Sequence, residues 1–348
     1  DLDYLLENVA IATVADVMDL TEENRILVKQ GLEMLKRTSN LGLRALIQCI
    51  GLEGKKIQAY HIGFILAPCL NASGKLDTAK RALALLRAKT EREADMLAGD
   101  LKALNESRRD MTDRVVDEAM AKVEQTDIRG DKVLVIYLPD CHESLAGLVA
   151  GRVRENYYRP VFVLTDSEDG VKGSGRSIES YSMYEELTGC GDLLTKFGGH
   201  PMAAGLSLDK ENVEKFKRRL NDQCTLSEEE LTEKVVIDME LPFAAITEHF
   251  IEELEYMEPF GKGNTKPVFA ARGVVMQHVK IIGKNKNVAK ATAIDAAGNR
   301  MEAICFHDAQ EFAERCERNN GKMSITFYPG INEFRGERQI QIVITHYR

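Results

Sequence analysis

Residues 132–164, KVLVIYLPDCHESLAGLVAGRVRENYYRPVFVL, decide the fold of the middle of the chain. Two short apolar runs, KVLVIYL at the start and PVFVL at the end, are typical of buried strands. Between them, SLAGLVAGRVRENYY has apolar residues at helical spacing. Strand, helix and strand in this order predict an α/β unit. A Gly-rich polar strand or loop, GVKGSGRSI, and a helix, NVEKFKRRLNDQC, complete that unit.

The segments on either side have different patterns. Residues 1–88 are predicted to be helical, with one helix in TEENRILVKQGLEML and another, KIQAYHIGFIL, that ends at Pro68. From Thr90 to about Gln125, apolar residues at helical spacing predict one connecting helix of about 36 residues and about 54 Å. After an acidic linker, LSEEELTEK, several short strands and one helix, DAQEFAERCER, suit a small OB-like barrel. We therefore divide the chain into residues 1–88, 89–126, 127–230 and 231–348.

The composition excludes several classes of protein. Of the 348 residues, 44% are hydrophobic and 29% are charged, which is typical of a globular protein with real cores. No long apolar run occurs, so we expect no membrane span. The first residues, DLDYLLENVA, lack both the pattern of a signal peptide and an initiator Met, so a fragment or a processed product is expected. The 7 cysteines form no CxxC pair, which favours reduced thiols in the cytoplasm and predicts no zinc site.

The net charge of −9 is unevenly distributed. From Gly261 to Arg348 there are 14 Lys and Arg against 8 Asp and Glu, so this end carries +6 and the rest carries −15. A basic tail on an acidic body makes nucleic acid a candidate partner of the tail. A solvated basic face without a partner is the alternative.

Two stretches of the first 88 residues contain candidate functional groups. Asp16 lies among small apolar residues in ATVADV, where a buried carboxylate needs a partner or a metal ion; a helix cap is the alternative. In LAPCLNASGKL, Pro68 and Gly74 predict a loop that displays Asn71 and Lys75, and such a loop can hold a phosphate. An ordinary turn between helices is the alternative.

Two more stretches lie in the α/β unit. In GVKGSGRSI, the glycines permit close approach of a ligand, and Ser174 and Arg176 supply donors that suit a phosphate. A glycine-kinked edge strand is the alternative. In FGGHPMAAGL, Gly198 and Gly199 let the backbone approach a ligand, and His200 can donate a hydrogen bond to a phosphoryl oxygen at neutral pH.

Together, these stretches give the chain a family resemblance. The chain resembles the RecJ family of single-strand-specific DNA exonucleases, which belong to the DHH phosphoesterases. The resemblance covers nearly the whole chain, and the stretches that carry it occur in the family's order: ATVADVMDLTEENRILVKQGL, LAPCLNASGKLDTA, CHESLAGLVAGRVRENYYRPVFVL, GVKGSGRSIESYSMYEEL, KFGGHPMAAGLSL, EPFGKGNTKPVF and INEFRGERQIQIVI. It implies an α/β multidomain fold: the helical C-terminal part of a DHH domain, the connecting helix, an α/β DHH-associated domain and an OB-like barrel.

The resemblance also implies a metal site, most of which lies outside this sequence. Proteins of the family have an aspartate pair and an Asp-His-His motif before the first stretch, and neither occurs in the chain. The family's last aspartate motif corresponds to Asp16 in ATVADV, so Asp16 becomes a candidate catalytic metal ligand. Two divalent ions, Mn²⁺ or Mg²⁺, are implied; they activate water and stabilise the leaving oxygen. Because one aspartate cannot hold two ions, we expect the chain alone to bind single-stranded DNA without cutting it.

The resemblance assigns further roles to residues of the DHH-associated domain. His200 is implied to act on the phosphoryl group being cleaved, while Gly198 and Gly199 give the phosphate access. Ser174 and Arg176 are implied to hold a phosphate near the 5′ end. Further phosphate-binding candidates are Asn71, Lys75 and His142, and for His142 a capping role is an equal alternative. Many relatives have Arg in place of Cys69 and Lys75, so the chain lacks the bidentate fork there.

The barrel is implied to bind the DNA strand. Candidate residues that neutralise the backbone are Lys280, Lys284, Lys286, Lys290 and Arg335. Three aromatic residues, Phe327, Tyr328 and Phe334, are candidate stacking platforms, with core packing as the alternative for each.

The function implied is 5′-to-3′ hydrolysis of single-stranded DNA in repair and recombination. A helicase or a single-strand-binding protein is implied as a possible partner, and a membrane is not. One alternative is a DHH-family phosphodiesterase acting on short oligoribonucleotides or cyclic dinucleotides, although such enzymes generally lack a barrel. The other alternative is a DNA-binding scaffold without catalytic activity.

Overall fold

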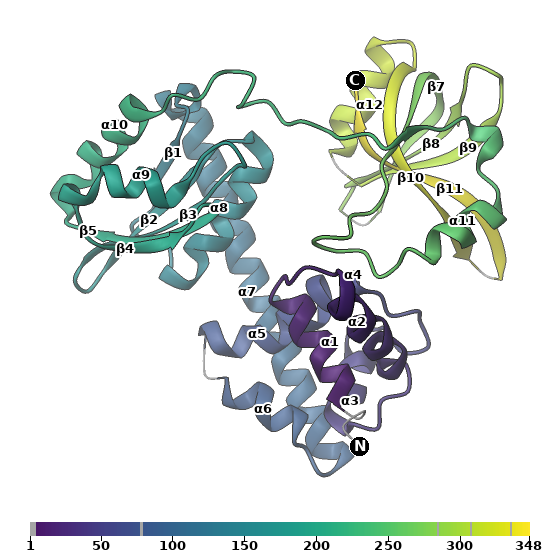
Figure 1. The fold of residues 1–348 in the computed structure, drawn as a ribbon, viewed down its shortest axis with the longest axis horizontal. Helices are drawn as coiled ribbons and strands as arrows, with labels where there is room; N and C mark the ends of the chain where they lie inside the picture. Colours follow the sequence, from purple (N-terminus) through teal and green to yellow (C-terminus); the bar gives the residue numbers. More distant parts are fainter. Residues whose placement is uncertain (1–4, 77–78, 284, 307, 335) are drawn as a thin grey trace. The chain divides into compact units, whose positions relative to one another are not determined.

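The computed structural model of the protein describes residues 5–76, 79–283, 285–306, 308–334 and 336–348 (Figure 1). The chain divides into two units, each assembled from separate segments. The first unit contains residues up to Thr38, Glu53–Ala67 and the chain from Val235 onward. The second contains Ser39–Leu52 and Pro68–Lys234. The division into four segments made from the sequence stays a prediction.

The second unit begins with helices. They are α3 (Leu41–Cys49), α5 (Ala67–Leu76), α6 (Lys80–Leu86) and α7 (Glu91–Gln125). Asn40 caps α3, because its side-chain oxygen accepts from the Leu43 N–H at 3.0 Å. The backbones of α3 and α6 approach closely: a Cβ on Gly42 would lie 1.9 Å from the Leu85 carbonyl oxygen.

The predicted loop around Asn71 is wrong, because this segment is helix α5. A π-helical turn, Ile62–Leu66, runs directly into α5. Pro68 therefore lies inside one continuous helical run, directly after the π-helical turn, and does not end it. Sequence reasoning treated this proline as the end of the helix.

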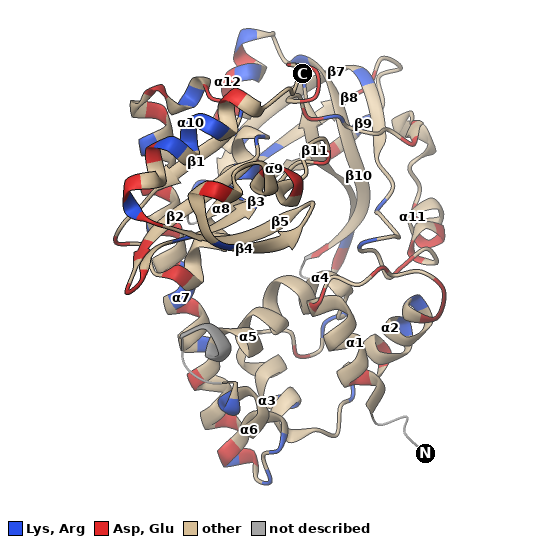
Figure 2. Ribbon diagram, turned by 60° about the vertical axis from the view of Figure 1, so that its left-hand side comes forward, with Lys and Arg blue, Asp and Glu red and all other residues tan. Residues whose placement is uncertain are grey.

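The long helix predicted from Thr90 to about Gln125 is confirmed as α7, while its role as a connector of two domains stays a prediction, because all of α7 lies within the second unit. It has 35 residues, so it is about 53 Å long. The Thr90 side chain caps it by accepting from the Glu93 N–H at 3.2 Å. Charged residues occur along its length, as the red and blue parts of the ribbon show (Figure 2).

A five-stranded sheet with order β1-β2-β3-β5-β4 follows in the second unit. Its strands are β1 (Leu134–Tyr137), β2 (Val161–Ser167), β3 (Gly170–Arg176), β4 (Leu194–His200) and β5 (Ala203–Leu208). Its helices are α8 (Glu143–Tyr157), α9 (Met183–Gly189) and α10 (Val213–Gln223). β1 and β2 are parallel and joined through α8, so the predicted α/β unit is confirmed.

The sheet separates two apolar clusters. One face packs against α9 and α10, where Phe162 and Phe216 meet edge to face at 5.6 Å between ring centroids. On the other face, the apolar residues that pack against α7 and α8 lie on β1 and β2, such as Val161 and Val163. The same face of β3, β5 and β4 contributes nothing to the cluster under α8.

The first unit combines helices with a barrel. The helical elements are α1 (Leu6–Ala15), α2 (Glu22–Leu35), α4 (Ala59–His61) and the π-helical turn Ile62–Leu66. The barrel elements are β6 (Met239–Glu240), α11 (Glu248–Glu255), β7 (Phe269–Ile282), β8 (Val288–Ile294), β9 (Arg300–Cys305), α12 (Ala309–Arg318), β10 (Lys322–Phe334) and β11 (Glu337–Tyr347). The strand order is β10-β11-β9-β8-β7-β6, and pairing of β10 with β7 closes the barrel. The OB-like barrel is therefore confirmed, while α11 was not predicted.

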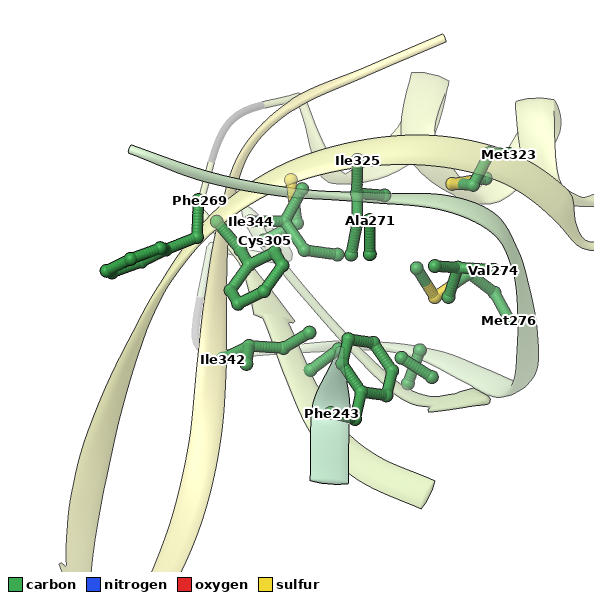
Figure 3. Packing of buried hydrophobic residues seen from close by; sticks show 14 of the residues in the cluster. Phe243, Phe269, Ala271, Val274, Met276, Cys305, Met323, Ile325, Ile342 and Ile344 are labelled. Carbon is green, nitrogen blue, oxygen red and sulfur yellow. The ribbon is translucent and has the colours of Figure 1, made fainter. Parts of the chain in front are cut away.

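An apolar cluster fills the barrel. Figure 3 shows part of it, with Ile325, Ala271 and Ile342 on different strands directed into one interior. Phe327 is fully buried and contacts Phe243 edge to face at 5.9 Å between ring centroids. The core-packing alternative for Phe327 is therefore correct, and the stacking role is wrong.

The loop between α11 and β7 contacts the α1–α2 connection of the same unit. The Leu20 N–H donates to the Lys262 carbonyl at 2.6 Å, and the Lys262 ammonium pairs with Asp19 at 2.9 Å. The Arg25 guanidinium donates to the carbonyls of residues 256–258 at 3.0–3.3 Å. The EPFGKGN motif thus holds the segment that follows Asp16.

We expect Phe327→Ala to lower the free energy of unfolding of the first unit by about 3–5 kcal/mol, because it opens a cavity among aromatic rings. Chemical denaturation measures this loss. The matched control is Phe306→Ala, whose side chain is 54% exposed, and it should change the free energy by less than about 0.5 kcal/mol. Equal losses for the two variants would contradict the placement of Phe327.

Candidate nucleic-acid interface

Alternation along β3 sorts its residues onto two faces. In a strand, successive side chains point to opposite sides of the sheet. A Cβ on Gly173 would lie 2.5 Å from Leu164 Cδ2, and one on Gly175 would lie 2.7 Å from Phe162 Cε1. A side chain at either position would therefore enter the core, so the packing of the sheet requires these two glycines. The expectation that they admit a ligand stays a prediction. The polar residues of β3 occupy the opposite face: Lys172, Ser174 and Arg176.

Strand pairing extends this polar face into three rows across β3, β5 and β4. Directly paired residues share a face, and neighbouring rows lie about 7 Å apart. The histidine row is Arg176, Ala203 and His200; the glycine row is Ser174, Gly205 and Gly198; the lysine row is Lys172, Ser207 and Lys196. The structure thus brings the predicted Ser174, Arg176, Gly198 and His200 together on one face.

Arg176 is a half-buried cation without a carboxylate partner among the described residues. Its Nη1 donates to the Gly175 carbonyl at 2.8 Å, and its guanidinium lies against Gly147 of α8, where a Cβ would be 2.8 Å from Nη2. Burial, and then the nearby Arg154, lower the pKa of Arg176. A cation in such surroundings favours an anionic ligand.

His200 ends β4 in an exposed position beside a tight hairpin. It pairs with Ala203 across the two-residue turn Pro201–Met202. Gly199 has φ +153°, and a Cβ there would lie 2.4 Å from the Ala203 carbonyl oxygen, so Gly199 is needed by the hairpin. A Cβ on Gly198 would meet no heavy atom within 4 Å, so of these two glycines only Gly198 leaves open space for a ligand.

A hollow of about 520 Å³ lies over the glycine and lysine rows. Its lining includes residues of all three strands and of the start of α8, but neither Arg176 nor His200. The polar and glycine residues that line it are Glu143, Ser144, Thr165, Lys172, Gly173, Ser174, Lys196, Gly198, Gly205 and Ser207. Sequence reasoning missed the lysine row, although the polar alternation within residues 170–176 was a signal for Lys172.

The start of α8 supplies the rim of this hollow. His142 is the N-cap of α8: its Nδ1 accepts from the Ser144 N–H at 3.2 Å and lies 2.8 Å from Ser144 Oγ. The capping alternative for His142 is therefore the one that the geometry supports. Glu143 pairs with Lys172 at 2.7 Å, and this contact lowers the pKa of Glu143.

The candidates in residues 1–88 lie elsewhere. Asp16 is the C-cap of α1 and is exposed, so the expectation of a buried carboxylate is wrong. Asn71 is exposed on α5, and Lys75 belongs to the same helix, although its side chain lies outside the described part of the structure. Within the described residues, no three His, Cys, Asp or Glu side chains form a metal-binding group, so these residues alone do not fit a two-metal site. Asp16 offers one carboxylate.

The basic candidates of the barrel lie around the β7–β8 hairpin. Lys280 and Lys290 are paired across it, and Lys290 also contacts Glu302 at 2.6 Å. Lys286 is exposed between the two strands. Lys284 and Arg335 lie outside the described residues, as does the side chain of Phe334. Tyr328 is partly buried, and the Lys266 ammonium lies 4.0 Å from its ring centroid.

We expect Gly199→Ala to lower the free energy of unfolding of the second unit by at least about 1–3 kcal/mol, because the hairpin has no room for a Cβ. Gly198→Ala is the matched control and should cost less than about 0.5 kcal/mol. Urea denaturation of both variants measures the difference. Similar losses would mean that the hairpin does not have this geometry.

Comparison with protein-family models matches two segments of the chain. Residues 130–226 match the DHHA1 domain, and residues 237–346 match the RecJ OB domain. The chain is 36% identical over 346 residues to the single-stranded-DNA-specific exonuclease RecJ of Bacillus subtilis, covering 98% of this chain and 44% of that protein. It is 33% identical over 356 residues to the RecJ of Escherichia coli, covering 99% of this chain and 61% of that protein.

Solved structures agree with the sequence comparison. The crystal structure of RecJ in complex with Mg²⁺ from Thermus thermophilus matches with a TM-score of 0.82 and 26% identity, covering 99% of this chain and 52% of that one. A second structure of the same organism's RecJ contains Mn²⁺ and has the same TM-score of 0.82. The chain therefore spans about half the length of the relatives that it matches. The chain thus has a DHHA1 domain followed by a RecJ OB domain, and nearly its whole length is similar to part of the RecJ exonucleases.

Proposed function

We propose that the chain holds single-stranded DNA for an exonuclease of the RecJ type. Such an enzyme hydrolyses phosphodiester bonds from the 5′ end with two divalent metal ions, in DNA repair and recombination. One observation carries the proposal: the guanidinium of Arg176 is half-buried next to Arg154 and has no carboxylate partner among the described residues. A phosphate is the anion that this guanidinium suits, because both have the geometry for paired hydrogen bonds.

The three rows of the polar face suggest a separate role in DNA binding for each residue. Arg176 and Ser174 would hold a phosphate of the strand, one as a charged donor and the other as a neutral donor. His200, in the same row as Arg176, would donate a hydrogen bond to the phosphoryl group that is cleaved. Gly198 would leave room for the strand, while Gly199 would keep the hairpin in shape.

Asp16 would add one carboxylate to the metal site. Mn²⁺ and Mg²⁺ are bound in the related Thermus thermophilus structures, and oxygen ligands such as a carboxylate suit both ions. When bound, two such ions activate water and stabilise the leaving oxygen. Within the first unit, the loop at Lys262 holds the segment after Asp16.

The barrel would bind the strand through backbone charge. Lys280, Lys286 and Lys290 gather at one hairpin, and Glu302 balances part of this charge. The OB domain match favours this proposal over a DHH phosphodiesterase of short oligoribonucleotides or cyclic dinucleotides.

Location and protein partners follow the family proposal. None of the 7 cysteines forms a disulfide in the described residues, which fits a reducing compartment, and we propose the cytoplasm. Among the described residues, no helix is both long and apolar enough to cross a bilayer. A helicase or a single-strand-binding protein remains a proposed partner.

We expect Arg176→Ala to weaken binding of a 5′-phosphorylated single-stranded oligonucleotide by about 1.5–3 kcal/mol, because a charge-assisted hydrogen bond is lost. Fluorescence anisotropy of a labelled oligonucleotide measures the Kd. Lys215→Ala, which removes an exposed cation from α10 on the other side of the sheet, is the control.

In the intact exonuclease, His200→Ala should lower kcat more than it raises KM. Unchanged binding by Arg176→Ala and unchanged turnover by His200→Ala would refute the proposed site.

For the barrel, we expect the double variant Lys280→Ala, Lys290→Ala to weaken binding and to reduce the slope of log K against log salt by about 1.4, because each lost phosphate contact removes about 0.7. A salt series with the same oligonucleotide measures the slope. Arg318→Ala, which removes an exposed cation from α12, should leave it unchanged. If both variants give the wild-type slope, the hairpin is only a solvated basic face.

A further inference from the structure

The lysine row is the most strongly cationic part of the hollow in the DHHA1 domain. Lys172 and Lys196 are both paired with Ser207, one from each side, so the two ammonium groups and the hydroxyl share one face. All three residues line the hollow, as does Ser144 at the start of α8. Four donors therefore surround one open space.

The charges in this space are not balanced. Glu143 is the only carboxylate that lines the hollow among the described residues, and it pairs with Lys172 at 2.7 Å. Lys196 forms no ion pair among the residues that the structure describes. The first turn of α8 adds the partial positive charge of a helix N-terminus at the same rim. The hollow thus has one uncompensated lysine and favours an anion.

The distance between the lysine row and Arg176 decides whether one DNA strand can reach both the hollow and the proposed phosphate site. Lys172 lies four residues before Arg176 on β3, a separation of about 14 Å. Each nucleotide of a stacked strand adds about 3.4 Å of length, so a stacked strand covers this span in about four nucleotides. An extended strand covers it in fewer. A strand that runs along β3 from Arg176 would therefore bring one of its next phosphates over Ser207.

We propose that the lysine row is a second phosphate subsite, which binds an internal phosphate of the strand whose other phosphate lies at Arg176. This inference rests on the proposed function and deepens it. Lys172 and Lys196 hold the phosphate from two sides, and Ser207 donates a hydrogen bond from below. The ligand is the sugar–phosphate backbone, so the subsite does not distinguish bases.

Glu143 has a regulating role in this subsite. In the absence of a strand it neutralises Lys172, which lowers the repulsion between the two lysines. An incoming phosphate competes with the carboxylate for the same ammonium group. Removing the negative charge of Glu143 therefore tightens binding, whereas removing either lysine weakens it. Substitutions of Glu143 and of Lys172, which contact each other, should therefore change the affinity for the strand in opposite directions.

The test compares single variants in one binding assay. The probe is a labelled, 5′-phosphorylated oligothymidylate, and its Kd is measured by anisotropy across a salt series. We expect Lys172→Ala and Lys196→Ala each to weaken binding about three- to tenfold and to reduce the salt slope by about 0.7. We expect Glu143→Gln to tighten binding about two- to fivefold, the range of an exposed ion pair. Matched controls on α10 are Lys215→Ala and Glu214→Gln, and thermal unfolding verifies that every variant is folded.

A second measurement locates the phosphate. Oligothymidylates with a single neutral methylphosphonate linkage, moved one position at a time from the 5′ end, replace the uniform probe. The wild-type protein should lose affinity at one internal linkage within about the first four. The variant Lys172→Ala, Lys196→Ala should show no loss at that linkage.

The outcomes separate this inference from the proposed function. If the lysine variants bind like Lys215→Ala, or remain as sensitive as the wild type to the internal neutral linkage, the second subsite is refuted. If Arg176→Ala still weakens binding in that case, the proposed function stands and only the further inference fails. If Arg176→Ala is also without effect, both fail.

Discussion

The packing over Gly173 and Gly175 is the constraint on which the candidate site depends. Leu164 and Phe162 occupy the space that a Cβ would need at these positions, so no larger residue fits there. A shift of β3 by one residue would turn Lys172, Ser174 and Arg176 into the apolar cluster under α9 and α10, at a prohibitive cost. The close contact on the core face therefore fixes which residues of β3 lie on the polar face. Strand pairing with β5 and β4 places Ser207, Lys196 and His200 on the same face.

The first unit uses glycine in the same way at the EPFGKGN loop. A Cβ on Gly261 would lie 2.7 Å from Leu20 Cδ1, and Gly263, with φ +75°, would bring one to 3.1 Å from Asp19 Cβ. Backbone contact with the α1–α2 connection is thus possible only because both side chains are absent. The Gln58 amide and the Lys56 ammonium reach Glu258 of the same loop at 2.7 and 3.2 Å. Helices and barrel of this unit are therefore joined by direct polar contacts.

The sequence predicted those features that depend on local pattern. The strand–helix–strand run, helix α7 and the barrel follow from periodicity and are confirmed. Pro68 misled because a π-helical turn continues directly into α5, so this proline lies within a helical run instead of ending it. Asp16 misled because apolar neighbours in the sequence do not show whether a side chain at a helix end is covered, and here it is exposed. The lysine row was missed for another reason: Lys172, Lys196 and Ser207 are distant in sequence, and only strand pairing brings them together. The roles of His200 and Arg176 remain predictions.

The segmented composition of the two units has a consequence for synthesis on the ribosome. Residues up to Ala67 include the helices of the first unit, but the barrel of that unit begins only after Val235. At about 5–20 residues per second, the ribosome needs roughly ten to thirty seconds to make the intervening chain. During this interval α1, α2 and the Tyr60–Phe64 pair lack the loop and barrel that belong to their unit, while the α/β unit is itself being made. The contacts of α1 and α2 with the EPFGKGN loop therefore form later than they would in a unit made from one continuous segment.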